Sequence, residues 1–266
     1  MKRLQIGIGI LRPLILGILL GATLFLSERA KQWEVKQPVA RQRGWLHDDL
    51  YDTPCRWCYM KVDEDGWLTT PVSNLKLKEL IHTPDKEIVI PILPTVYAPN
   101  SDDALYYNTI LESDIEQGDK VLVIGTGSGS DAWVASLKSQ SLVYAIDINP
   151  MAIANTKATA RLGNFQVKPT LGDIRTIELC EDFSNCDFVL WNMPFLDKEG
   201  EIKEVNFHDG DRGSILESFL TLLPSLLNKD GQAIIFNTAD ALKLINFPNV
   251  TTKRSGNNAV CIIRNE

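Results

Sequence analysis

Glycines and acidic residues follow three apolar runs of the sequence, at places where a ligand could meet them. The glycine stretch 125–129 (GTGSG) follows the run 120–124, Asp147 closes the run 142–147, and Asp173 comes shortly after the run 165–171. Glycine lets a backbone approach a ligand closely. The Asp147 carboxylate is placed to accept both hydroxyls of a ribose, and Asp173 could accept from an adenine amino group. Together they predict a nucleoside-binding site, whereas the glycine stretch alone could be only a tight turn.

The elements that position these residues follow from the alternation of apolar runs with helical patterns. The runs 120–124, 142–147, 165–171, 187–191 and 232–236 are predicted strands, and 131–139, 149–162 and 212–227 are predicted helices. Asn149 and Pro150 are typical of the cap and the first position of a helix, and 250–254 with 259–264 predict a terminal antiparallel hairpin. Repeated β-α units predict an α/β fold with a doubly wound, mostly parallel seven-stranded sheet, whose ligand site lies at the carboxyl ends of the strands.

The glycine pattern distinguishes between two nucleoside cofactors. A dinucleotide fingerprint G-x-G-x-x-G needs glycine or alanine at position 130, which is serine, and the third glycine comes one residue earlier. The resulting G-x-G-x-G resembles the first motif of class I S-adenosylmethionine-dependent methyltransferases. This resemblance implies S-adenosylmethionine as the cofactor. It also implies the residues that bind it: Gly125, Thr126, Gly127, Gly129, Asp147, Ile148, Asp173, Ile174 and Asn192.

The stretch Asn192-Met193-Pro194-Phe195, after the run 187–191, resembles the (D/N/S)-P-P-(Y/F/W) signature of methyltransferases that act on amino or amide nitrogen. The resemblance implies that these four residues form the catalytic loop. The lone pair of such a nitrogen is delocalised into a planar π-system. The Asn192 side-chain oxygen and the Met193 carbonyl could accept its two N–H bonds while Phe195 stacks on the planar group. Positioning and exclusion of water then suffice without a strong base; the alternative is that Asn-x-Pro only forms a turn.

Two further stretches resemble the HemK-type glutamine methyltransferases and their small-domain relatives. Residues 96–107 (VYAPNSDDALYY) resemble the V-Y-x-P-(S/A)-E-D-(S/T)-x-L-L segment before the core, and residues 209–236 resemble a D-G-x-x-G helix–strand segment. The chain departs from the family in three respects. Val123 stands where a strand acid usually contacts the cofactor, Met193 replaces the first proline and predicts a less rigid loop, and the N-terminal part does not resemble the helical substrate domain of release-factor enzymes.

The N-terminal segment 4–26 is hydrophobic, with Arg12 as its one charge. It is long enough to cross a hydrocarbon core about 30 Å thick. No A-x-A cleavage site follows, so we expect an uncleaved anchor; a cleavable signal peptide and a membrane-surface helix are the alternatives. Two Lys/Arg precede the segment and five follow it closely, which favours a cytoplasmic main domain. The expected localisation is a single-pass membrane protein with its catalytic domain in the cytoplasm.

Residues 44–94 form a small aromatic-rich accessory segment. Asp65-Gly66 between two β-prone runs predicts a hairpin, and two prolines mark 88–94 as a linker or an edge strand. Ser101 is the expected N-cap of the helix that follows, with acids in its first turn.

The chain has five cysteines, which are too few for a disulfide scaffold in 266 residues. Cys55-x-x-Cys58 admits a zinc or redox function. A structural zinc site needs four ligands and no second C-x-x-C is present, so we expect free thiols and no metal site.

The composition, 44% hydrophobic and 23% charged, is that of a folded protein. Residues 92–266 carry 14 Lys/Arg against 23 acids; this charge disfavours nucleic acid and favours a protein or a small molecule as methyl acceptor. We expect three parts: 1–43, a membrane anchor and basic linker; 44–94, the accessory segment; and 95–266, the methyltransferase domain. The alternatives are a nicotinamide-dependent oxidoreductase and a non-catalytic membrane assembly module with a cofactor-binding fold.

Overall fold

Three β-sheets and their flanking helices make up the part of the chain that this computed structural model describes, residues 56–73, 87–178, 180–196, 208–209 and 214–265. The strands are β1 (Arg56–Val62), β2 (Leu68–Ser73), β3 (Glu87–Ile92), β4 (Val121–Ile124), β5 (Val143–Asp147), β6 (Val167–Leu171), β7 (Cys186–Asn192), β8 (Phe195–Leu196), β9 (His208–Asp209), β10 (Leu227–Thr238), β11 (Val250–Ser255) and β12 (Asn258–Arg264). The helices are the 3-10 helix η3 (Ser101–Asp103), α2 (Ala104–Glu112), α3 (Ser130–Ser139), α4 (Pro150–Leu162), α5 (Ser214–Leu226) and α6 (Ala239–Leu242).

The largest sheet has seven strands in the order β11-β12-β10-β7-β4-β5-β6. Strands β10, β7, β4, β5 and β6 are parallel to one another, and β12 runs antiparallel between β10 and β11. The predicted α/β fold is therefore confirmed as a Rossmann-like seven-stranded mixed sheet. The predicted terminal hairpin is the β11–β12 pair.

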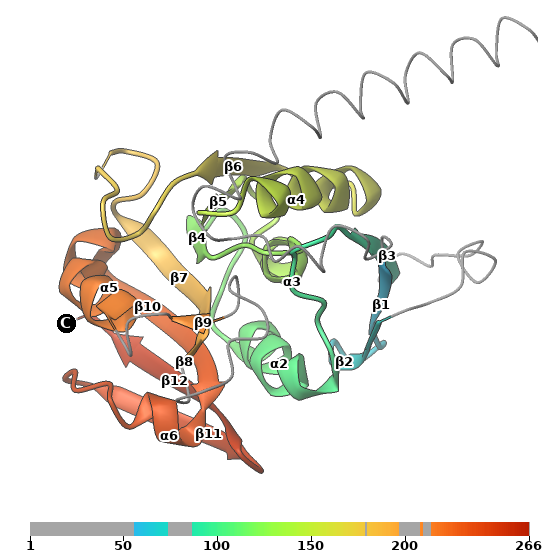
Figure 1. Cartoon of the computed structure of the whole chain (residues 1–266). Coiled ribbons are helices and arrows are strands. Elements are labelled where there is room, and N and C mark those ends of the chain that lie inside the picture. The colour runs from blue at the N-terminus through green and yellow to red at the C-terminus, as the bar shows by residue number, and fades with distance from the viewer. Residues whose placement is uncertain (1–55, 74–86, 179, 197–207, 210–213, 266) are drawn as a thin grey trace, which may run out of the picture. The chain divides into compact units, whose positions relative to one another are not determined.

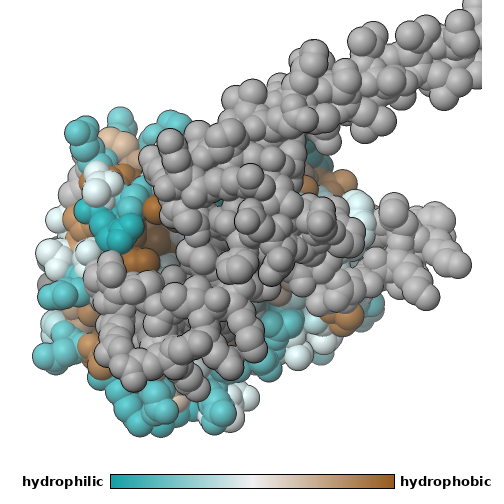
Figure 2. Space-filling model, in the orientation of Figure 1, coloured by the Kyte–Doolittle hydropathy of each residue, from teal (hydrophilic) through white to brown (hydrophobic). Residues whose placement is uncertain are grey.

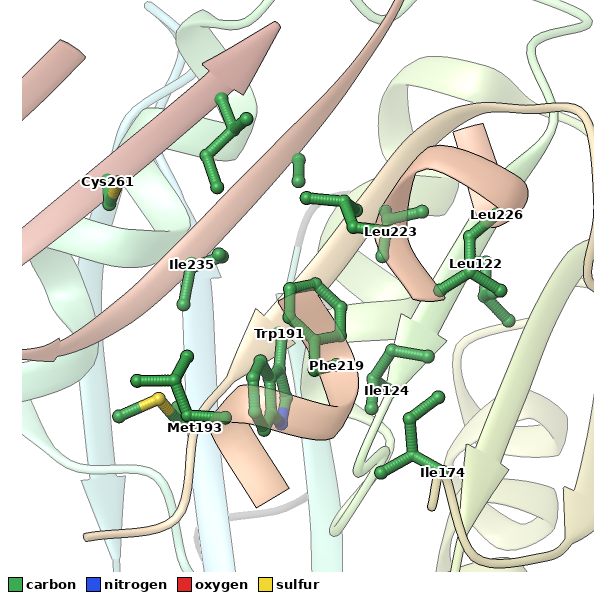
Figure 3. Close-up of a cluster of buried hydrophobic side chains, with 14 of the residues drawn as sticks. Leu122, Ile124, Ile174, Trp191, Met193, Phe219, Leu223, Leu226, Ile235 and Cys261 are labelled. Atoms are coloured by element: carbon green, nitrogen blue, oxygen red, sulfur yellow. The ribbon is translucent and has the colours of Figure 1, made fainter. Parts of the chain in front are cut away.

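Helices cover both faces of this sheet, as Figure 1 shows, with α5 on one side and α2, α3 and α4 on the other. On the α5 face, the rings of Trp191 and Phe219 lie 4.4 Å apart in a tilted arrangement, inside the buried hydrophobic cluster of Figure 3. On the α2 face, Tyr106 stacks on Phe236 at 5.6 Å. Successive side chains of a strand point to opposite faces of the sheet. Each central strand therefore contributes buried side chains to both hydrophobic layers.

Local sequence signals explain where several elements begin. The Asn149 side chain accepts a hydrogen bond from the Met151 N–H, and Pro150 takes the first position of α4, as predicted. Because a capping side chain satisfies a backbone donor that the helix leaves free, α4 begins at a fixed residue. It follows β5 directly and holds the end of that strand in place.

A separate three-stranded sheet has the order β2-β1-β3. The predicted hairpin is confirmed, with Gly66 in the left-handed region (φ 86°) between β1 and β2. Strand β3 is an edge strand, one of the two forms expected from its prolines, and Pro91 lies opposite Trp57. The backbone N–H of Leu93, just after β3, donates to Asn155 of α4 (2.8 Å). Because α4 packs on β5 and β6 of the larger sheet, this bond ties the small sheet to the large one.

The predicted helix after residue 100 differs from the observed one. Asn100, not Ser101, is the N-cap, because its side chain accepts from the Asp102 N–H (2.8 Å) while Asp103 accepts from the Asn100 N–H. This reciprocal pair is a capping box and opens a 3-10 turn before α2. The helix ends at Glu112, because Ser113 is extended and its hydroxyl donates to the Ile110 carbonyl.

The described surface on the face shown in Figure 2 mixes hydrophilic side chains with hydrophobic ones. The large hydrophobic residues that are exposed among the described residues are Trp67, Val72, Leu162, Leu171, Leu244 and Val250.

Within the described ranges we find no helix of the length and hydrophobicity that crossing a membrane requires. The predicted anchor, residues 4–26, and Cys55 lie outside those ranges.

Candidate active site

The glycine loop, residues 125–129, and Asp147 meet where β4 and β5 end. Asp147 accepts a hydrogen bond from the Gly127 N–H through Oδ2 (2.9 Å) and from the Asn149 N–H through Oδ1 (2.8 Å). The Thr126 N–H donates to the carbonyl of Ile146 (3.1 Å). The structure thus brings the first two predicted site elements into direct contact.

Gly129 and Gly127 of this loop differ in the space around them. A Cβ on Gly129 would lie 2.9 Å from the Thr156 Cα of α4, so glycine is required there for the packing of α3 on α4. Gly127 is also left-handed (φ 50°), yet a Cβ would meet no atom closer than 3.8 Å. The Thr126 hydroxyl is buried against the Thr156 hydroxyl (3.1 Å). Only part of the loop is therefore left for a ligand.

Asp147 is partly buried and carries a perturbed carboxyl group. Burial raises its pKa to about 6, although the N–H groups of Asn149, Gly127 and Ile148 favour the ionised form. Each carboxylate oxygen accepts one of the two hydrogen bonds described above and has a further lone pair. Asp147 can therefore still accept hydroxyl donors.

Asp173 and Ile174 follow β6, and both have protein partners. The Asp173 carboxylate accepts from the guanidinium of Arg175 through both oxygens, at 3.0 Å from Nε and 2.7 Å from Nη2. The Ile174 side chain is buried in the hydrophobic cluster on the α5 face (Figure 3). The Asp173 side chain is 20% exposed, so an adenine amino group could reach it only by sharing or displacing this bidentate ion pair.

Asn192 ends β7, and its side chain contacts a residue that sequence reasoning did not include in the site. The Asn192 Nδ2 donates to Oδ1 of Asp103, 3.0 Å away. Asp103 is 1% exposed. Its Oδ2 accepts from the Asn100 N–H (2.8 Å) and the Tyr97 hydroxyl (3.1 Å). The sequence signals at Asp103 were the acidic first turn of a helix and its place in the family-like stretch 96–107, but 89 residues separate it from Asn192.

Met193 and Pro194 are held by contacts from strand β10 and from the hydrophobic cluster. The Met193 side chain is 3% exposed and lies in the hydrophobic cluster beside Trp191 (Figure 3). Its N–H donates to the Phe236 carbonyl (3.1 Å). The buried Asn237 donates through Nδ2 to the carbonyls of Met193 (2.8 Å) and Pro194 (3.1 Å). These contacts hold the backbone of residues 193–194, and the lower rigidity expected from the missing proline stays a prediction.

Phe195 is described only through its backbone, which pairs in β8 with His208 of β9. The proposed stacking of its ring lies outside what the structure describes.

Buried carboxylates dominate the electrostatics of this region. Burial raises the pKa of Asp103 to about 6 and that of Asp131, in the first turn of α3, to about 7. Asp131 accepts from the hydroxyls of Ser130 (3.1 Å) and Tyr107 (3.3 Å), while its Oδ2 is buried without a partner. Among the described residues no Lys or Arg is buried. The site is therefore acidic and suited to a ligand with positive charge.

The described part of the chain holds no cluster of side chains that could bind a metal ion. Cys58 is buried, its thiol faces the Pro99 carbonyl (3.6 Å), and burial raises its pKa to about 12. A thiol in this state is a poor nucleophile and a poor ligand. For Cys58, the free-thiol interpretation fits better than the zinc or redox one.

No family model matches the sequence. Over 162 residues the chain is 30% identical to MJ0928 of Methanocaldococcus jannaschii, which carries the provisional name protein N5-glutamine methyltransferase; the match covers 57% of this chain and 77% of that protein. Over 148 residues it is 28% identical to the methyltransferase HEMK2 of Homo sapiens, covering 51% of this chain and 68% of that protein.

The fold is similar to that of the T. thermophilus 16S rRNA N2 G1207 methyltransferase RsmC, solved in complex with AdoMet and guanosine. The TM-score is 0.54 at 14% identity, and the match covers 68% of this chain. It covers 48% of RsmC, so this chain spans about half the length of that protein. At this identity the likeness concerns the fold alone.

Proposed function

Because the chain belongs to the HemK-type class I S-adenosylmethionine-dependent methyltransferases, we propose that it methylates the side-chain amide nitrogen of a glutamine in a protein. Membership rests on the M. jannaschii relative, 77% of which is covered at 30% identity. It confirms the resemblance predicted from residues 95–240, and the nicotinamide oxidoreductase alternative is wrong. The choice of glutamine follows the name of that relative.

The observation that carries the proposal is the arrangement of hydrogen-bonding groups at the end of β7. Asp103 accepts a hydrogen bond from the Nδ2 of Asn192, and among the described residues no donor contacts the Oδ1 of the same amide, so this oxygen can accept an N–H from a substrate. The Met193 carbonyl accepts from Asn237 and has a second lone pair. These two oxygens suit an acceptor that presents two N–H donors on one planar nitrogen, as a primary amide does.

The charge of the site fits S-adenosylmethionine, which when bound supplies an electrophilic methyl group on a positively charged sulfur. The described site holds carboxylates and no buried Lys or Arg. We assign the binding of the ribose hydroxyls to Asp147, because both its oxygens have lone pairs left. We assign the close approach of the backbone to the cofactor to Gly127. Val123, fully buried, provides no charge at the position of the family's strand acid, so the remaining carboxylates must balance the charge.

In this proposal Asn192 and the Met193 carbonyl orient the acceptor nitrogen and no side chain acts as a strong base. Holding both N–H bonds aims the nitrogen lone pair and removes the entropy cost of finding that orientation. With S-adenosylmethionine bound, the N–CH3 bond would form as the S–CH3 bond breaks to leave a neutral thioether, and the methylated nitrogen, now acidic, would release its proton to water. The Phe195 ring is proposed to stack on the acceptor amide, which resonance keeps planar.

Transfer of a labelled methyl group tests the proposal. The full-length protein is incubated with labelled S-adenosylmethionine and separate fractions of soluble protein, membranes and RNA, and labelled protein is hydrolysed to identify N5-methylglutamine. Asn192→Ala should lower transfer about a hundredfold, near 3 kcal/mol, with cofactor affinity almost unchanged. Asn257→Ala, an exposed turn residue, is the control. Label in RNA, or no loss in Asn192→Ala, would overturn the proposal, and no transfer at all would favour the non-catalytic alternative.

We also propose that residues 1–43 anchor the chain in a membrane, with residues 44–94 and 95–266 as accessory segment and methyltransferase domain in the cytoplasm. The hydrophobic run 4–26 and the excess of Lys/Arg after it support this orientation. Deletion of 1–43 should release a protein that still binds cofactor. Protease digestion of upright and inverted vesicles tests the orientation: cleavage of the main domain only from the periplasmic or luminal side would refute it.

A further inference from the structure

The hydrogen bond between Asn192 and Asp103 has a fixed direction. An ionised carboxylate only accepts hydrogen bonds, and an amide side chain donates only from its nitrogen. Within the described residues, Asp103 Oδ1 has Asn192 Nδ2 at 3.0 Å. As long as Asp103 is ionised, the Asn192 amide is therefore oriented with nitrogen toward Asp103 and oxygen away from it.

Asp103 is itself prevented from turning. Its Oδ2 accepts from the Asn100 N–H and the Tyr97 hydroxyl, and the Tyr97 oxygen accepts in turn from Asn100 Nδ2 (2.8 Å). The residue is almost fully buried. One carboxylate oxygen is thus used by the capping box of η3 and the other is presented to the end of β7.

We propose that Asp103 is a positioning residue that sets the donor–acceptor polarity of the active site, by holding the Asn192 amide so that Oδ1 faces the methyl acceptor. This inference rests on the proposed function, since it concerns the same loop. With the amide in this orientation the site accepts N–H donors. With the amide turned by 180°, Asn192 would present its NH2 group to the substrate. The N–H groups of a substrate amide would then face a hydrogen-bond donor instead of an acceptor.

The substitution Asp103→Asn reverses this polarity without removing bulk. The Asn100 N–H can only donate, so the amide oxygen at position 103 must face it and the amide nitrogen must face Asn192. Asn192 then turns its own oxygen inward. We expect turnover about a hundredfold lower, similar to Asn192→Ala, with cofactor affinity within about twofold of the wild type. Thermal stability should be retained, because the hydrogen bond persists with its direction reversed.

The double substitution Asp103→Asn with Asn192→Asp provides the rescue. A carboxylate at position 192 accepts from the amide at 103 with one oxygen and presents the other to the acceptor. We expect the turnover of the double variant to be at least tenfold higher than that of Asp103→Asn. Wild-type turnover in Asp103→Asn, or a folded double variant that is no faster than Asp103→Asn, would overturn the proposal.

Solvent exchange of the Asn192 side-chain NH2, measured by NMR on the full-length protein without substrate, separates this inference from the proposed function. The resonances are identified by their loss in Asn192→Ala. Slow exchange in the wild type and faster exchange in Asp103→Asn support the orientation even if glutamine is not the acceptor. Equal exchange in both proteins would refute it, whatever the acceptor.

Discussion

Replacing Asp131 by asparagine should stabilise the ligand-free protein, and more at high pH than at low pH. Asp131 is buried at the start of α3 and burial raises its pKa from 3.8 to about 7. The pKa is thus higher in the folded than in the unfolded protein. Such a carboxyl group destabilises the folded state progressively as the pH rises from 3.8 to about 7. The amide keeps an acceptor for Ser130 and Tyr107 and cannot ionise.

The size of the effect follows from the pKa difference. A raise of about 3 units corresponds to about 4 kcal/mol at about pH 8.5, where the carboxyl group is ionised in both states. At about pH 5.5 the folded protein keeps the proton, and the same linkage gives about 2 kcal/mol. The substitution places NH2 where Oδ2 now has no partner, so no existing hydrogen bond is lost.

Urea unfolding of full-length protein followed by tryptophan fluorescence measures both values. We expect Asp131→Asn to unfold at higher urea than the wild type, with the gap about 2 kcal/mol larger at pH 8.5 than at pH 5.5. Asp230→Asn, an exposed carboxyl group, is the control and should show no such gap. A variant less stable than the wild type at pH 8.5 would mean that the fold compensates the Asp131 charge, and the reasoning would fail.

Three further substitutions test the geometry of the site. Gly129→Ala should lower the free energy of unfolding in urea by about 2–5 kcal/mol, because it combines a left-handed backbone with a contact at 2.9 Å. The control Gly66→Ala, equally left-handed but with open space around it, should lower it by only about 1–2 kcal/mol. Equal losses would contradict the packing argument. Asp147→Ala should weaken S-adenosylmethionine binding about ten- to a hundredfold by calorimetry, and unchanged affinity would refute the ribose assignment. Asn237→Ala should destabilise the protein by about 1–3 kcal/mol and lower methyl transfer while cofactor affinity stays intact; full activity would show that the 193–194 carbonyls need no support.

The sequence predicted the elements whose signals are local. Asn149 and Pro150 start α4 where expected, and the apolar run at 120–124 is the buried strand β4. The glycine loop and Asp147 met as expected because parallel strands bring their carboxyl ends to one edge of the sheet. These predictions needed only the neighbouring residues and one rule of topology.

The contacts that position the catalytic loop could not be predicted in this way. Asp103 lies 89 residues before Asn192, and its type also suits a helix start. Asn237 follows a predicted strand with no pattern to connect it to Met193. The buried Met193 side chain replaces a proline by packing, and packing partners on other elements leave no periodic signal. A sequence shows which residue types occur, but only the fold shows which lone pairs are already used.

Helix α4 has one further consequence, for how freely parts of this protein can be exchanged with those of relatives. The buried Asn155 accepts from the Leu93 N–H and donates to the Ser128 carbonyl (2.9 Å). The buried Asn149 donates to the Thr95 carbonyl (2.9 Å). A chimaera whose exchanged segment ran through residue 95 and changed the backbone path there would leave the Asn155 oxygen and one Asn149 donor without these partners, at a cost of about 1–3 kcal/mol for each buried group. Helix α4 therefore joins the connection after β3 to the glycine loop, and a successful graft of the preceding segment has to carry the matching α4 with it.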